Sequence, residues 1–203
     1  MATVGEIQDV LRSITEFGDA ALIGPATCGL ATALWVAGEK RNARNLIALF
    51  ALCLAIIVVL KVVLMVVWTG GPLRSPSGHS AMSAFLYGSI ALMLVASSDA
   101  LIARLAAAAF GALVLVIAVS RFEIGGHSRT EALVGLAVGL GCALLFGRRS
   151  TGMKQLRLAT AVSACVAGVA VCVALYWLVA PGYVDEETIW SFAKWLRGVL
   201  RTA

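Results

Sequence analysis

The chain has 203 residues, of which 61% are hydrophobic and 13% charged, with a mean hydropathy of +0.95 and a formal net charge of +5. These proportions exclude a soluble globular domain, because a soluble chain of this size exposes far more polar surface. The apolar runs are continuous and lack the alternation of barrel strands. The sequence therefore predicts an all-α, polytopic membrane helix bundle that forms a single domain over residues 1–203.

An amphipathic helix is expected first, over residues 1–19. Apolar side chains recur there at helical spacing, with acidic side chains between them. The apolar residues are Ile7, Val10, Leu11, Ile14 and Phe17. This pattern is typical of an interfacial helix that lies on the membrane surface. The segment lacks the positive start and the short apolar core of a signal peptide, so we expect it to be retained.

A transmembrane core is expected next, over residues 20–180. An apolar helix needs about 20 residues to cross the hydrocarbon layer, and about six runs qualify, although the fifth is short: 20–37, 46–68, 79–97, 101–119, 132–146 and 158–180. Gly135, Gly139 and Gly141 in the fifth run favour close helix packing, which small residues four apart usually mark. Residues 185–201 should form an amphipathic C-terminal helix, since acids open the segment and bases close it.

The lysines and arginines predict the orientation of the bundle. They gather in the first, third and fifth loops between the expected spans: Lys40, Arg41, Arg44, Arg104, Arg148, Arg149, Lys154 and Arg157. Basic loops face the cytoplasm, so the second and fourth loops should face the periplasm of a bacterial inner membrane or its equivalent. Much of the positive charge is therefore explained by the orientation of the protein in the membrane, and no nucleic-acid partner is needed to account for it.

Two polar segments interrupt the apolar chain and hold its two histidines: Pro76-Ser77-Gly78-His79, and Ser120-Arg121-Phe122-Glu123-Ile124-Gly125-Gly126-His127 with Glu131 beyond it. Each lies where an apolar run starts or stops, so both should lie near one membrane surface. Lys61 should point toward the same surface from inside the second run. A charge at that depth costs at least about 2.5 kcal/mol, which favours a functional cation over a lysine that only snorkels to the surface.

The first segment has the features of an anion-binding helix start. Ser77 is a plausible N-cap, and Gly78 permits close approach to the backbone, whose amides can meet an anion. Arg74, two residues before Pro76, adds a planar donor fork that suits phosphate oxygens.

The second segment has the features of an activated nucleophile. Glu131 follows His127 by four residues, so one helical turn would bring the carboxylate beneath the imidazole. That pairing would fix the tautomer and leave the other ring nitrogen as a nucleophile. Two histidines, several cations and a carboxylate at one membrane face suit phosphoryl transfer.

The sequence resembles the type-2 phosphatidic acid phosphatase superfamily, the membrane relatives of vanadium haloperoxidases. The family's Pro-Ser-Gly-His signature matches fully at residues 76–79, and its Ser-Arg-x5-His-x3-Asp signature matches at 120–131, with Glu131 in place of the aspartate. Its Lys-x6-Arg-Pro signature matches only at Lys61, because Trp68 and Thr69 stand where Arg-Pro is expected. Arg74 is the expected substitute for the missing arginine. The order of the spans also differs from that of the usual six-span member of the family. Only one clear span precedes Lys61 in this chain, and one extra span follows the third signature.

The resemblance implies a phosphatase that needs neither metal nor cofactor and acts on a lipid phosphate or diphosphate. His127 would attack phosphorus, His79 would protonate the leaving oxygen and later help activate water, and Glu131 would orient His127. Phosphate would be bound by residues from both segments and the second run: Lys61, Arg74, Ser77, Gly78 and Arg121. The alternatives are a lipid-to-lipid phosphotransferase with the same site and a membrane transporter.

Overall fold

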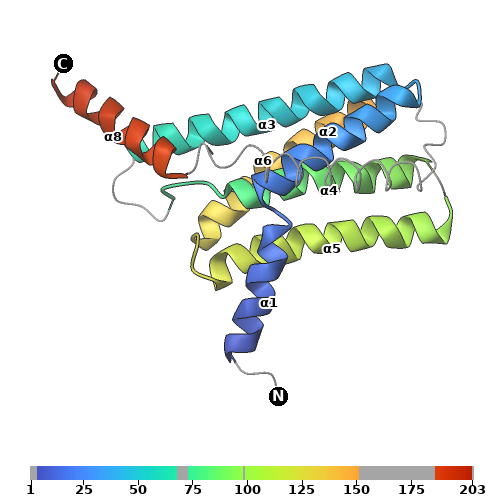
Figure 1. The fold of residues 1–203 in the computed structure, drawn as a ribbon, viewed down its shortest axis with the longest axis horizontal. Helices are drawn as coiled ribbons and strands as arrows, with labels where there is room; N and C mark the ends of the chain where they lie inside the picture. The colour runs from blue at the N-terminus through green and yellow to red at the C-terminus, as the bar shows by residue number, and fades with distance from the viewer. Residues whose placement is uncertain (1–3, 68–72, 98, 151–185, 203) are drawn as a thin grey trace, which may run out of the picture.

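A computed structural model describes residues 4–67, 73–97, 99–150 and 186–202, and the secondary structure of these residues is helical (Figure 1). The helices in chain order are α1 (Val4–Glu16), α2 (Ala20–Val36), α3 (Lys40–Val67), α4 (Gly78–Ser97), α5 (Leu101–Glu123), α6 (Arg129–Arg149) and α8 (Glu186–Thr202). The predicted all-α membrane bundle is confirmed. The sixth expected span, 158–180, lies outside the described residues, as do Trp68 and Thr69.

Within the part of the chain that the structure describes, five segments are long and apolar enough to cross a membrane: Gly5–Val36, Lys40–Val67, Gly78–Ser97, Leu101–Glu123 and Arg129–Arg149. The first of them turns at residues 17–19, so that α1 leaves the bundle at an angle to α2 (Figure 1). Helices are present where the sequence predicts amphipathic ones at both ends of the chain. α1 packs against α5, and α8 packs against α3.

Several helices extend beyond the apolar runs that predicted them. α3 begins at Lys40 rather than 46, α5 continues to Glu123, and the short fifth run becomes a helix of 21 residues. An apolar run marks only the part of a helix that suits hydrocarbon, whereas the backbone hydrogen bonds continue through polar residues until a cap ends them. Gly38 and Gly125, with φ of +88° and +75°, supply such ends after α2 and α5.

α4 lies at the centre of the bundle, packed on one side against α5 and on another against α6 (Figure 1). The contact with α6 is close because Gly135 and Gly139 have no side chain. A Cβ at Gly135 would collide with the carbonyl oxygen of Ser77, and one at Gly139 with that of Ala81. A Cβ at Gly141 would meet no atom within 4 Å, so the predicted close packing is confirmed for two of the three glycines.

The helices of the bundle alternate in direction, which brings both reactive segments to one end. The α1–α2 turn, the end of α3, the start of α4, the end of α5 and the start of α6 lie toward the left in Figure 1. The opposite end carries the basic residues of the predicted cytoplasmic loops that the structure describes: Lys40, Arg41, Arg44, Arg104, Arg148 and Arg149.

Candidate active site

Glu131 joins the two reactive segments. Its Oε1 accepts hydrogen bonds from the backbone N–H groups of Arg74 (2.8 Å) and Ser75 (2.7 Å). Its Oε2 accepts from the backbone N–H of Ser128 (2.9 Å) and lies 3.3 Å from Nδ1 of His127. The residue is only 8% exposed, and hydrogen bonds to a carboxylate favour its charged form. One buried anion therefore connects the loop before α4, the start of α6 and His127.

The predicted pairing of Glu131 with His127 is present in the structure. A capping box fixes the start of α6, because the Ser128 hydroxyl accepts from the backbone N–H of Glu131 while the Glu131 carboxylate accepts from that of Ser128. The carboxylate can only accept, so Nδ1 of His127 carries the hydrogen, and in the neutral ring Nε2 is the nitrogen with the lone pair. The His127 side chain is 5% exposed, which limits the orientations that the ring can adopt.

Ser77 forms the expected N-cap of α4. Its hydroxyl accepts from the backbone N–H of Ser80 (3.3 Å), and its own N–H donates to the backbone carbonyl of Glu131 (3.0 Å). Ser77 is fully buried, so direct contact of its hydroxyl with phosphate stays a prediction. A Cβ at Gly78 would meet no described atom within 4 Å. Among the described residues, none therefore blocks the close approach of a ligand to the start of α4 at Gly78.

His79 lies beside an acid that the sequence interpretation missed as a site residue. Its Nε2 is 3.4 Å from Oδ2 of Asp19. The other carboxylate oxygen of Asp19 accepts from the backbone N–H of Ala21 (2.7 Å) and caps α2. The sequence pattern predicts Asp19 only as part of the interfacial helix over residues 1–19. The signal that could have identified it is its place directly before the first apolar run, on the predicted membrane face of both histidines.

Arg121 lies in the last turn of α5 and contacts three parts of the site. Its Nη1 donates to the hydroxyl of Thr15 (3.4 Å), and its carbonyl accepts from the N–H of His127 (3.1 Å). A Cβ at Gly126 would lie 3.0 Å from Nη2 of Arg121, so this glycine gives the guanidinium its space. Thr15, which is buried at the end of α1, is a second contact that local sequence did not predict.

The remaining cations differ in how they are held. Lys61 is 7% exposed and lies on the inward face of α3 with Ile57 and Met65, near the end of the helix that faces the site. The side chain of Arg74 is exposed, although its backbone N–H is anchored on Glu131. The guanidinium of Arg129, by contrast, lies over the ring of Phe122, with its Cζ 5.6 Å from the centroid.

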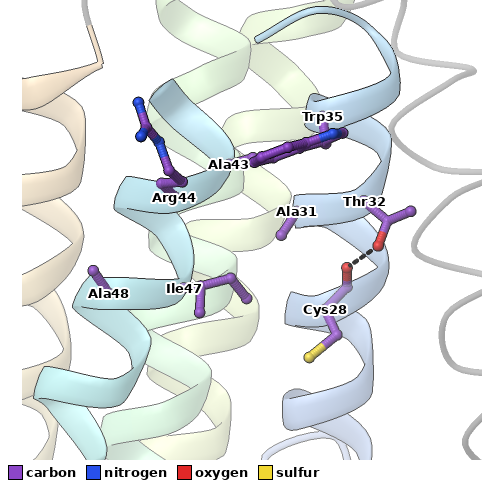
Figure 2. A pocket seen from close by; sticks show the side chains of 8 residues that line it. All are labelled: Cys28, Ala31, Thr32, Trp35, Ala43, Arg44, Ile47 and Ala48. Atoms are coloured by element: carbon purple, nitrogen blue, oxygen red, sulfur yellow. Dashed lines mark hydrogen bonds between the residues drawn. The ribbon is translucent and has the colours of Figure 1, made fainter. Parts of the chain in front are cut away.

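A hollow lies between the end of α2 and the start of α3, and Figure 2 shows the side chains that line it. It has a volume of about 590 Å³ between α2 and α3 and is lined by Cys28, Ala31, Thr32, Trp35, Ala43, Arg44, Ile47 and Ala48. The Thr32 hydroxyl donates to the carbonyl of Cys28 (2.9 Å) within the same helix. None of the candidate site residues lines this hollow, so it is separate from the histidine cluster.

Possible metal ligands are dispersed over residues 4–67, 73–97, 99–150 and 186–202, where no group of three His, Cys, Asp or Glu side chains is arranged to hold a metal ion. Comparisons with models of known protein families, with curated proteins and with solved structures give no match to this chain. The likeness to the type-2 phosphatidic acid phosphatases therefore stays a prediction from the two signature segments of the sequence.

Proposed function

We propose that this chain is an integral membrane lipid phosphatase that hydrolyses a phosphate monoester or diphosphate of a lipid through a phosphohistidine. The observation that carries the proposal is the carboxylate of Glu131, which is bonded to the loop of the first segment and to His127 of the second. A structural carboxylate needs no histidine partner. A carboxylate that orients an imidazole next to an open helix start suits attack on a bound anion.

The first half of the reaction transfers the phosphoryl group to His127. The lone pair on Nε2 attacks phosphorus, and the bond from phosphorus to the lipid oxygen breaks. The leaving oxygen takes a proton from His79. Glu131 stabilises the positive charge that develops on the His127 ring, because its Oε2 lies 3.3 Å from Nδ1.

The second half restores the enzyme. A water molecule gives a proton to neutral His79 while its oxygen attacks the phosphohistidine, and the bond from nitrogen to phosphorus breaks. Inorganic phosphate leaves and His127 regains its lone pair. The same imidazole therefore acts first as general acid and then as general base, as microscopic reversibility requires for a two-step displacement.

The phosphate oxygens would be held by cations and backbone donors from different elements. Arg121 at the end of α5 and the open start of α4 at Gly78 support this role by their positions. Arg74 is anchored through its backbone on the same carboxylate that contacts His127, and its exposed side chain is long enough to turn toward a bound phosphate. Lys61 would add a further cation from α3.

We further propose that the site faces the periplasm of a bacterial inner membrane. The basic residues at the far end of the bundle support cytoplasmic placement of that end. A site at the membrane surface would receive the phosphate head group while the lipid tail stays among the helices. The partners of the protein are thus its lipid substrate and the surrounding membrane lipids.

The direct test is phosphate release by purified protein in detergent from a panel of lipid phosphates and diphosphates, with EDTA present. We expect release that survives the chelator and is inhibited by vanadate, which imitates five-coordinate phosphorus. Activity that EDTA abolishes and magnesium restores would contradict the proposed mechanism. Transfer of the phosphoryl group to an added lipid without release of phosphate would instead identify a phosphotransferase.

A further inference from the structure

We propose that Asp19 is a positioning residue for His79, which it holds as the imidazolium that protonates the leaving group. This inference rests on the proposed function and extends it to the junction between α1 and α2. The site would then contain two histidine–carboxylate pairs, of which Glu131 serves the nucleophile His127 and Asp19 serves the general acid.

The first argument is the need for such a partner. His79 is the second residue of α4, and the N-terminal turn of a helix disfavours a positive charge, because the partial positive charge of the helix dipole lies there. A general acid at this position must nevertheless hold its proton until the leaving oxygen needs it. A carboxylate 3.4 Å from Nε2 of His79 supplies the opposite charge.

The second argument is that the junction is built against the site. The hydroxyl of Tyr87 on α4 donates to the carbonyl of Phe17 (2.8 Å), and Arg121 on α5 donates to Thr15. A Cβ at Gly18 would lie 3.2 Å from the carbonyl oxygen of His79. Contacts from α4 and α5 therefore hold the chain directly before Asp19 against the site. The hydrogen bond from the Ala21 N–H holds the half-exposed carboxylate itself.

The third argument is that the two carboxylate oxygens of Asp19 have different partners. Oδ1 caps α2 through the N–H of Ala21, whereas Oδ2 faces His79. A role as helix cap alone would leave the second oxygen without a function. Asp19→Asn separates the two roles, because asparagine caps helices as well as aspartate does but carries no charge.

The proton path balances in both half-reactions. As the phosphorus–oxygen bond breaks, its electron pair stays on the leaving oxygen, and that oxygen receives the proton from the His79 imidazolium. His79 is then neutral, and it recovers a proton from the attacking water. Asp19 stays ionised throughout and never exchanges a proton with substrate.

The test compares two substrates in the same preparation of Asp19→Asn protein. Dodecyl phosphate has an alkoxide leaving group that needs a proton, whereas a nitrophenyl phosphate with a dodecyl chain on the ring has a leaving group that departs without one. General acid catalysis contributes about 10²–10⁴-fold. We expect the turnover of dodecyl phosphate by Asp19→Asn to fall at least about tenfold. Its turnover of the nitrophenyl ester should stay within about twofold of that of the original protein.

The ratio of the two rates does not depend on how much of the variant is folded, so partial misfolding cannot imitate the result. Asp19→Glu, which keeps the charge, should recover part of the alkyl phosphate activity. Asp99→Asn is the matched control, because Asp99 is fully exposed and pairs with Arg104 at the other end of the bundle. Its substrate ratio should equal that of the original protein.

Equal losses on both substrates in Asp19→Asn, or no loss on either, would overturn the role of Asp19. If the unaltered protein releases phosphate from neither ester nor from any lipid phosphate, the proposed function itself is wrong. The two failures are thus distinguishable.

Discussion

Replacement of Glu131 by glutamine should disable the site, because each of the two carboxylate oxygens serves a pair of hydrogen-bond partners and glutamine keeps only one oxygen. Oε1 faces the N–H groups of Arg74 and Ser75, while Oε2 faces the N–H of Ser128 and Nδ1 of His127. A glutamine side chain has one oxygen and one NH₂ group. With the NH₂ group at the Oε1 position, the N–H groups of Arg74 and Ser75 lose their acceptor; with it at the Oε2 position, the N–H of Ser128 loses its acceptor and Nδ1 of His127 must accept instead of donate.

The size of the effect follows from that geometry. Each buried donor left without an acceptor costs about 1–3 kcal/mol, so the loss of one or two acceptors in Glu131→Gln should lower the free energy of unfolding by about 1–6 kcal/mol. The catalytic loss should be larger, because a histidine whose orienting carboxylate is neutralised can adopt the wrong tautomer, which costs up to about 10⁴-fold in kcat in the serine proteases. We expect turnover to fall at least about 10³-fold. Glu131→Asp should lie between, since the charge is kept but retracted by one methylene.

The assay is phosphate release from a lipid phosphate, with thermal unfolding in the same detergent as the stability measurement. Glu123→Gln is the matched control, because Glu123 is exposed at the end of α5 on the same face of the bundle. Its turnover and stability should be close to those of the unaltered protein. Turnover of Glu131→Gln within about threefold of the unaltered protein would refute the reasoning.

Two further predictions concern the phosphate clamp and the helix contact behind it. Arg74→Ala should reduce kcat about 10–100-fold with little change in stability, because the exposed guanidinium acts on the transition state while the backbone bond to Glu131 is kept; Arg74→Lys should recover part of the activity. If turnover collapses in Arg129→Ala and is unchanged in Arg74→Ala, Arg74 is not the arginine that binds phosphate. Gly135→Ala should lose about 1–3 kcal/mol of stability and most phosphate release, because its Cβ would displace Ser77. Gly141→Ala, whose Cβ meets no atom, should be close to neutral in the same melting and activity assays, and equal melting of the two variants would contradict the packing.

The parts of the site that local sequence predicted correctly depend on short-range geometry. An interval of four residues on a helix brings Glu131 beneath His127, and a serine before a glycine-led helix caps α4 through Ser80. The spans within the described residues were likewise predictable, since hydrocarbon requires about 20 apolar residues per helix. Helix ends were less so: α3 begins at Lys40 because backbone hydrogen bonding continues beyond the apolar run.

The parts that local sequence did not predict depend on contacts between distant segments. Asp19 and His79 are 60 residues apart, and the N–H groups of Arg74 and Ser75 reach a carboxylate more than 50 residues later. Such contacts arise from the turn between α1 and α2 and from the close packing of α4 on α6, which no local periodicity encodes. The local sequence around Asp19 therefore does not distinguish it from other acids of an interfacial helix, and only the fold shows that it lies beside His79.

The most direct measurement of the central claim is a search for the covalent intermediate on His127. Protein mixed with a ³²P-labelled lipid phosphate and quenched rapidly in alkaline detergent should carry label that is stable in alkali, lost in acid and located on the peptide that contains His127. Arg129→Ala should be labelled normally, and folded His127→Ala should neither be labelled nor release phosphate. Label or turnover that persists in His127→Ala would contradict a phosphohistidine mechanism at this site.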